Sequence, residues 1–436
     1  MVVHGHLPAA AGVAVNAALV AYLALYPALF AVLVRRIVMA FGTRFLMTAP
    51  IVWVATEFGR THLFTGFPWV LLGYSQASVL PVAQLASVFG VYGVSALVAA
   101  VSAAAATAVL ARRSAEWVPA AGATAVVVAV ATVAGALRVQ GGALIAGDGV
   151  RVGLVQGNVD QAHKWDVARA SGIFEDYMRL SRDAIADGAT FVVWPESSAP
   201  FRFEEGQGAS ERIRELARDA GVSILVGSDE VERGSTPRFF NSAIMVGPDG
   251  STGGVYRKLH LVPFGEYVPL RSVFFFAAPL IETVADFSPG EDAVLLPVGD
   301  RLVSTAICYE IVYPGLVRQF VRGGSDLLVT ITNDAWFGRT SAPYQHFTQA
   351  AMRAIENGRY LVRSANTGIS GVVDPYGRVL AQSRLFEPAA IVAEVRYRDA
   401  FTIYTRIGDV FAYASVFAVL AMVVGARRRV QYRIKG

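Results

Sequence analysis

Cysteine and charge are the two scarcest features of this 436-residue sequence. The single cysteine, Cys308, excludes an intrachain disulfide. The six histidines are scattered, and none forms a metal-ligand pair with Cys308, so the pattern does not favour a metal site. Charged residues make up only 17% of the chain, which is too few for an ordinary soluble protein. The net charge of +4 is modest, and its basic residues do not indicate nucleic-acid binding.

Hydrophobic residues are abundant, at 54%, but they are unevenly distributed along the chain. Residues 1–148 are rich in Ala, Val and Leu and carry few charges, whereas residues 149–400 have the mixed composition of a soluble α/β domain. Residues 401–436 contain one more apolar run and a basic end. The sequence therefore predicts a helical membrane region, a globular domain of about 250 residues that can bury a full core, and a closing span.

Five apolar runs are predicted to cross a membrane, although the second, of about 14 residues, is short for a span. The segment 63–82 is also apolar, but Pro68 and Pro81 interrupt it, and we expect it to be re-entrant or interfacial. The predicted spans lie near residues 9–34, 45–58, 84–111, 118–137 and 410–425.

Basic residues predict the orientation of these spans, because loops on the cytoplasmic side collect Lys and Arg. With five spans, Arg35, Arg36 and Arg44 fall on the same side as Arg112-Arg113 and the tail Arg427–Lys435. Counting 63–82 as a further span would put Arg112-Arg113 on the opposite side of the membrane from Arg35, Arg36 and Arg44. We therefore expect the globular domain to lie outside the cytoplasm.

Alternating strand and helix patterns begin near residue 150 and predict an α/β layered sandwich with a mixed sheet. Early strands alternate with helices, and later strands pair as hairpins. Strands are predicted at 150–155, 190–194, 222–227, 240–246, 254–257, 302–307, 327–332, 361–363, 371–373 and 390–395, and helices at 167–187, 210–220, 313–322 and 344–357.

Three residues that can do chemistry follow directly after apolar strands: Glu196, Lys258 and Cys308. The ends of such strands are where open α/β sheets tend to build their sites. A carboxylate can take the proton of a thiol, and an ammonium can stabilise the oxyanion that forms after attack. Together they are a complete set for acyl transfer through a thioester. Taken singly, each residue also has an ordinary interpretation. Glu196 can be an acid in a surface turn, Lys258 a solvated charge, and Cys308 a small buried hydrophobic residue.

The order Glu196, Lys258, Cys308 and the segments around these residues resemble the nitrilase, or carbon–nitrogen hydrolase, superfamily. The closer resemblance is to its integral membrane branch, the apolipoprotein N-acyltransferases, and it runs from about residue 10 to residue 425. The segments that carry it are Lys258–Glu266, Cys308–Glu310, Thr65–Trp69, Gln156–Asn158, Lys164–Asp166, Asn333–Gly338 and Gln345–Phe347.

The resemblance implies specific roles for residues of this chain. Cys308 is the nucleophile, Glu196 the general base and Lys258 the residue that stabilises the oxyanion. Glu266 and Glu310 match further important acids, of which the first helps to hold Lys258 and the second helps to orient the region of the thiol.

Lipid binding is the other role that the resemblance assigns to residues of this chain. Trp165 and Tyr309 match residues near the acyl and lipid site, and Trp69 is a further candidate for lipid binding. The implied fold is an αββα sandwich on a membrane bundle, without metal or cofactor.

The implied reaction takes a fatty acyl chain from a phospholipid, usually phosphatidylethanolamine, and passes it to the α-amino group of a diacylglyceryl-cysteine. That cysteine begins an apolipoprotein at the outer face of the bacterial cytoplasmic membrane. Family members usually carry eight spans and we predict five, so the first three are missing from the pattern. A membrane-tethered amidase with the same three residues, and a non-catalytic envelope scaffold, are the competing interpretations.

Overall fold

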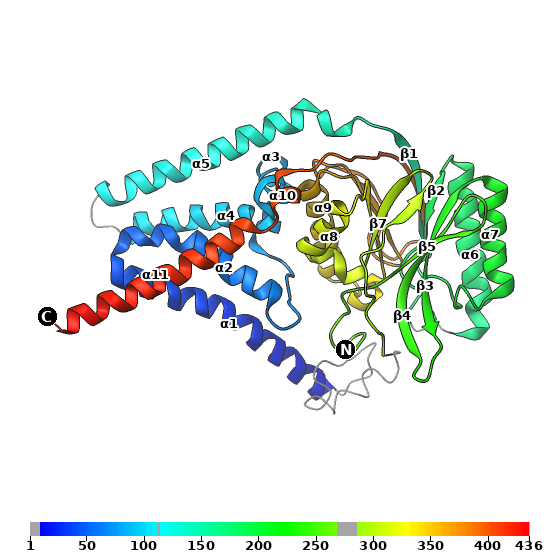
Figure 1. Cartoon of the computed structure of the whole chain (residues 1–436), viewed down its shortest axis with the longest axis horizontal. Helices are drawn as coiled ribbons and strands as arrows, with labels where there is room; N and C mark the ends of the chain where they lie inside the picture. Colours follow the sequence, from blue (N-terminus) through cyan, green and yellow to red (C-terminus); the bar gives the residue numbers. More distant parts are fainter. Residues whose placement is uncertain (1–8, 111–113, 162, 165, 268–285, 436) are drawn as a thin grey trace. The chain divides into compact units, whose positions relative to one another are not determined.

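The computed structural model describes residues 9–110, 114–161, 163–164, 166–267 and 286–435. The described residues divide into two compact units. Residues 144–401 form the globular unit, and residues 9–143 with 402–436 form the helical unit. Figure 1 shows that the helical unit is built of helices and that the globular unit contains the β-sheets.

The helical unit is organised around α2, which packs against α1, α4 and α11. Ile37 of α1, Val52 of α2 and Val419 of α11 form its buried apolar centre. Its elements are α1 (Ala9–Phe41), η1 (Thr43–Thr48), α2 (Ala49–His62), η2 (Leu72–Gln76), α3 (Leu80–Ala83), α4 (Ala86–Leu110), α5 (Ser114–Gly141), α10 (Ile403–Ile407) and α11 (Val410–Lys435).

Among the described residues, four helices are long and apolar enough to cross a membrane. They are Gly12–Phe41, Ala86–Leu110, Trp117–Gly141 and Val410–Arg429, and they coincide with four of the five predicted spans. The remaining predicted span, 45–58, is divided between η1 and the 14-residue α2, so its crossing of the membrane stays a prediction. Segment 63–82 holds only η2 and the start of α3, in line with the absence of a spanning helix there.

In the described part of the globular unit, two six-stranded mixed sheets carry helices on their outer faces. The strands are β1 (Gly149–Gln156), β2 (Phe191–Val193), β3 (Ser223–Glu232), β4 (Arg238–Val246), β5 (Thr252–Arg257), β6 (Leu296–Val298), β7 (Arg301–Ile307), β8 (Leu327–Thr332), β9 (Leu361–Ala365), β10 (Gly371–Val373), β11 (Val379–Gln382) and β12 (Ala389–Arg396). The helices are η3 (Ala143–Ile145), α6 (Val167–Ala186), α7 (Gln207–Ala220), η5 (Cys308–Val312), α8 (Pro314–Arg322), η6 (Asp334–Phe337) and α9 (Ala342–Asn357).

The two sheets have the orders β12-β1-β2-β3-β4-β5 and β11-β10-β9-β8-β7-β6. They face each other through β1 against β9 and β4 against β7. Helices α6 and α7 cover the first sheet, and α8 and α9 cover the second (Figure 1). The αββα sandwich is therefore confirmed. Strands β6 and β11 were not predicted, and β3 continues to Glu232, beyond its predicted end at 227.

Apolar strands and amphipathic helices account for this layering. The core beneath α6 and α7 is continuous and includes Trp194, whose indole stacks on Tyr177 at 5.0 Å between ring centres. The Trp194 indole N–H donates to the Ser181 hydroxyl at 2.8 Å, so its polar atom is satisfied inside the core. This packing fixes the chain immediately before Glu196.

Each sheet has three parallel strands at its centre, β1-β2-β3 in one and β7-β8-β9 in the other. Strand β5 is antiparallel to β4, and β4 is antiparallel to β3, so β5 ends at the same edge as β3. The carboxyl ends of β2, β5 and β7 lead to Glu196, Lys258 and Cys308, respectively.

Candidate active site

Glu196 lies in a tight turn after β2, and both of its carboxylate oxygens are held. Oε1 accepts from the Asn241 side-chain amide at 2.7 Å and lies 3.4 Å from Lys258 Nζ. Oε2 accepts from the backbone N–H of Asn333 at 2.8 Å. Since Asn333 follows β8 of the facing sheet, the carboxylate is fixed by both sheets at once.

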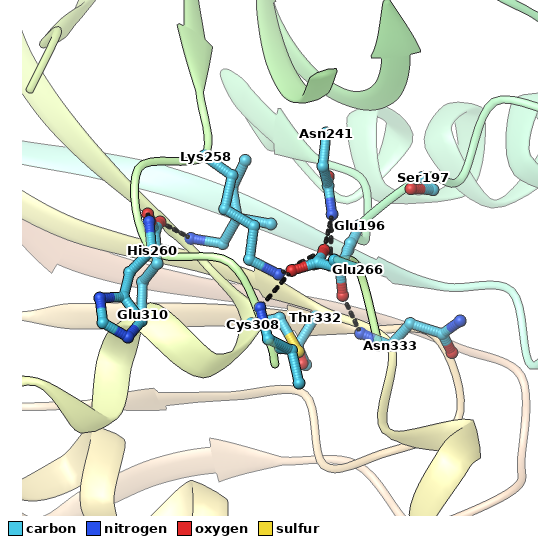
Figure 2. A network of polar contacts seen from close by, with 12 residues as sticks. Glu196, Ser197, Asn241, Lys258, His260, Glu266, Cys308, Glu310, Thr332 and Asn333 are labelled. Carbon is cyan, nitrogen blue, oxygen red and sulfur yellow. Dashed lines mark hydrogen bonds and ion pairs between the residues drawn. The ribbon is translucent and has the colours of Figure 1, made fainter. Parts of the chain in front are cut away.

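Lys258 follows β5 and is 1% exposed. Its ammonium donates to Glu266 Oε1 at 2.8 Å and lies near Glu196 on its other side. Burial lowers the pKa of Lys258, but the two carboxylates outweigh it and hold that pKa above its usual value. Lys258 is therefore a cation at neutral pH, fixed between two acids (Figure 2).

Cys308 follows β7 as the first residue of η5 and adopts a φ of +55°, which is unusual for a residue with a side chain. As a whole residue it is partly exposed to solvent. Burial and the nearby Glu196 carboxylate raise the pKa of its thiol to about 12, while Lys258 lowers it. The thiol is therefore protonated at neutral pH and needs a base before it can attack.

Glu310 acts as a clamp between the strand that leads to Cys308 and the segment after Lys258. Its carboxylate accepts from the Ile307 N–H at 2.7 Å and from the Leu259 N–H at 2.7 Å. It also accepts from the His260 N–H and the Tyr256 hydroxyl. Burial raises the pKa of Glu310 to about 7, although these backbone hydrogen bonds lower it.

Glu266 and Asn241 complete the polar cluster around Lys258 (Figure 2). Glu266 Oε2 accepts from the Val262 N–H at 2.8 Å, which leaves its Oε1 for Lys258 and for the Asn241 amide at 3.0 Å. Asn241 thus donates to Glu196 and to Glu266, and its amide bridges two carboxylates that would otherwise repel each other. Asn241 was not among the predicted site residues.

A second buried lysine, Lys164, was also missed. Its ammonium donates to the backbone oxygen of Glu196 at 3.3 Å. Burial lowers the pKa of Lys164, whereas the acids Asp229 and Glu196 raise it. The only available signal was its position beside Trp165 in a segment that carried the family resemblance.

The three predicted lipid-binding residues have different outcomes. Tyr309 is buried, and its ring meets Tyr313 edge to face at 5.3 Å between ring centres. Trp69 is partly exposed and belongs to the helical unit, in the turn between α2 and η2. Trp165 lies outside the described residues. Tyr309 directly follows Cys308 in the chain, and all three lipid-binding assignments stay predictions.

The cluster has the groups needed for thiol-based acyl transfer. Glu196 can accept the thiol proton, and the Lys258 cation can stabilise negative charge on a carbonyl oxygen. Among the described residues, no group of three or more His, Cys, Asp or Glu side chains could hold a metal ion.

Comparison with known proteins agrees with this reading of the fold. The carbon–nitrogen hydrolase family matches residues 151–400, and the apolipoprotein N-acyltransferase N-terminal domain matches residues 1–104. The αββα sandwich with its thiol cluster thus belongs to the carbon–nitrogen hydrolase, or nitrilase, class. An amidase from Nesterenkonia sp. is 24% identical over 61% of this chain and 95% of its own, with a TM-score of 0.46.

Relatives that align with nearly the whole chain identify its family within this class. An apolipoprotein N-acyltransferase from Geobacter metallireducens is 41% identical over 98% of this chain and 82% of its own length. One from Bradyrhizobium diazoefficiens is 37% identical, over 95% of this chain and 79% of its own. The chain belongs to the apolipoprotein N-acyltransferase family. It is an acyltransferase with a membrane helical part and a nitrilase-type domain.

Proposed function

We propose that this chain moves a fatty acyl chain from a phospholipid to the α-amino group of the diacylglyceryl-cysteine of an apolipoprotein, through a thioester on Cys308. The observation that carries the proposal is the convergence of a protonated thiol, a buried lysine cation and a fixed carboxylate at one edge of the sandwich. Membership of the acyltransferase family supports it independently.

In the first half-reaction, Glu196 takes the proton of the Cys308 thiol as the sulfur attacks the ester carbonyl of the phospholipid. The carbonyl oxygen becomes negative and is stabilised by the Lys258 ammonium. The ester C–O bond then breaks, and Glu196 returns the proton to the departing alcohol. The products are a lysophospholipid and a thioester between the acyl chain and Cys308.

In the second half-reaction, the α-amino group of the acceptor attacks the thioester carbonyl. Glu196 takes a proton from the attacking nitrogen, and Lys258 again stabilises the oxyanion. When the C–S bond breaks, the proton goes to the sulfur, which restores the Cys308 thiol and leaves an amide on the acceptor. The bond and proton balance needs neither metal nor cofactor.

Phosphatidylethanolamine is the proposed acyl donor, and the outer face of the bacterial cytoplasmic membrane is the proposed location of the globular unit. Two lipid-bearing substrates favour an enzyme that carries a membrane helical bundle, because soluble amides do not require one. The four long apolar helices found among the described residues support membrane insertion. Trp69 and Trp165 remain proposed lipid-binding residues, together with Tyr309.

An assay with purified protein, acyl-labelled phosphatidylethanolamine and a diacylglyceryl peptide tests the proposal. We expect labelled N-acyl peptide and lysophospholipid in equal amounts. Release of free fatty acid alone, with or without peptide, would mean that water is the acceptor and would favour the tethered amidase. A protein that consumes neither lipid nor a simple amide would favour the scaffold.

A further inference from the structure

A buried polar cluster lies behind the thiol, on residues that the mechanism above does not use. Asp334 of η6, His346 of α9 and Arg363 of β9 are each no more than 1% exposed. Asp334 Oδ1 lies 2.9 Å from His346 Nδ1, and the Arg363 guanidinium donates to Asp334 Oδ2 at 2.9 Å. A charged pair and an imidazole in a core are costly unless their geometry is well satisfied. Their burial therefore suggests a role other than general stability.

His346 reaches from this cluster to the nucleophile's own backbone. Its Nε2 lies 3.1 Å from the carbonyl oxygen of Cys308. Because a carbonyl oxygen can only accept, Nε2 is the ring nitrogen that carries a proton. Burial and the neighbouring Arg363 cation lower the pKa of His346, so this donor is a neutral imidazole at neutral pH.

The backbone of Cys308 needs such support. A φ of +55° is uncommon for a residue with a Cβ, and a strained backbone of this kind persists only where surrounding contacts hold it. The peptide group between Cys308 and Tyr309 is planar, so fixing its carbonyl oxygen also fixes the direction of the Tyr309 N–H. Glu310 holds the strand before Cys308, and His346 holds the peptide after it.

The same cluster is connected to the general base. Asp334 Oδ1 accepts from the Thr332 hydroxyl at 3.0 Å, and the intervening Asn333 N–H donates to Glu196. A Cβ on Gly368 would come within 2.4 Å of Asp334 Oδ2, so the space around this carboxylate is full. Segment 332–334 therefore contacts Glu196 on one side and the His346 ring on the other.

We propose that His346 is a positioning residue, which holds the Cys308 backbone in its strained conformation relative to Glu196 through the Nε2–H bond to the Cys308 carbonyl. This inference rests on the proposed role of Cys308 as the nucleophile. In this tautomer His346 Nδ1 is an acceptor, and the Arg363 guanidinium donates to it at 2.9 Å and orients the imidazole. Asp334 holds the same guanidinium, and Asn333 joins this support to the base.

A matched pair of substitutions tests this role. The amide nitrogen of Gln can occupy the place of Nε2 and donate to the Cys308 carbonyl, whereas the shorter Asn side chain reaches only the place of Nδ1. We expect His346→Asn to lower kcat and the single-turnover rate of Cys308 acylation by about 100-fold, as for a misplaced reacting group. We expect His346→Gln to stay within about threefold of wild type, and KM for the phospholipid to change little in either variant.

Equal behaviour of the two variants would overturn the proposal, whether both stay active or both lose activity. A large change in KM with kcat intact would overturn it as well. If His346→Asn does not fold, Asp334→Asn replaces it, with a lower acylation rate expected because Arg363 loses the carboxylate that holds it against His346 Nδ1. A Cys308→Ala control separates the two levels of inference: acyl transfer by that variant would refute the nucleophile itself, whatever His346 does.

Discussion

At the scale of single residues, Glu196 and Lys258 have the most direct tests. We expect Glu196→Gln and Lys258→Met each to lower the rate of acyl transfer by roughly 100- to 1000-fold, the loss typical of one group that stabilises a transition state. The steady-state rate of N-acyl peptide formation measures this. Insertion and thermal unfolding of each variant serve as controls. A variant within about threefold of wild type would remove that residue from the mechanism.

The pKa of Cys308 predicts how its reactivity depends on pH. Because this pKa is raised to about 12, the thiolate fraction is small at neutral pH and grows about tenfold per pH unit across the accessible range. Alkylation by iodoacetamide should therefore keep rising with pH, without the plateau that an ordinary thiol shows above about pH 9. The lone cysteine makes the measurement unambiguous. A plateau near neutral pH would show that the resting thiol is already ionised.

Sequence reasoning identified Glu196, Lys258 and Cys308 because each follows an apolar strand, a position that can be recognised locally. Asn241 was missed because it lies within β4, where a polar residue on a strand usually faces solvent. The Asn241 amide reaches the carboxylates of Glu196 and Glu266 only because β4 pairs with β5 in the folded sheet. The contact of His346 with Cys308 depends on how α9 packs against η5, which no local pattern encodes.

At the scale of elements, the close approach of β3 to the Glu196 turn is a sharp constraint. A Cβ on Gly227 would lie 2.0 Å from the Pro195 carbonyl oxygen and 2.9 Å from the Glu196 Cα. We expect Gly227→Ala to displace the turn and lower kcat by about 100-fold, as for other small misplacements of reacting groups.

The matched control is Gly172→Ala. Gly172 lies on the exposed face of α6, and a Cβ there meets nothing within 4 Å. This substitution should raise the free energy of unfolding by about 0.5–1 kcal/mol through helix propensity, with activity unchanged. If Gly227→Ala were as active as Gly172→Ala, the turn would not need its present position.

Periodicity predicted most strands of the sandwich and the helices on its faces, because their apolar patterns are long and regular. Strands β6 and β11 have three and four residues, too short for alternation to be recognised. The run 45–58 was predicted as a span from its composition, whereas the structure begins α2 only at Ala49 after a 3₁₀ turn. Composition shows that a segment is apolar, but it does not show where a 3₁₀ helix ends and an α-helix begins.

At the scale of the whole molecule, the basic clusters predict the orientation in the membrane. We expect a reporter fused after Gly436 to be cytoplasmic and one inserted near Gly206 to be exported, because one topology puts the predicted basic loops on a single side. The compartment-specific activity of the two fusions measures this. Both reporters on the same side would show that the number of spans is not five.

A cytoplasmic globular unit would have a further consequence. The proposed acceptor acquires its diacylglyceryl group at the outer face of the membrane. Cys308 could not meet it from the inside. That outcome would favour the tethered amidase over the proposed transfer to apolipoproteins.

The acyl-enzyme is the most direct test of the central claim that Cys308 carries the acyl chain. Intact-mass spectrometry of the protein after incubation with phosphatidylethanolamine, without acceptor, should show one added acyl chain that hydroxylamine removes. Cys308→Ser should show no hydroxylamine-labile adduct, and addition of a diacylglyceryl peptide should discharge the wild-type adduct. An active protein that forms no adduct on Cys308 would contradict the account.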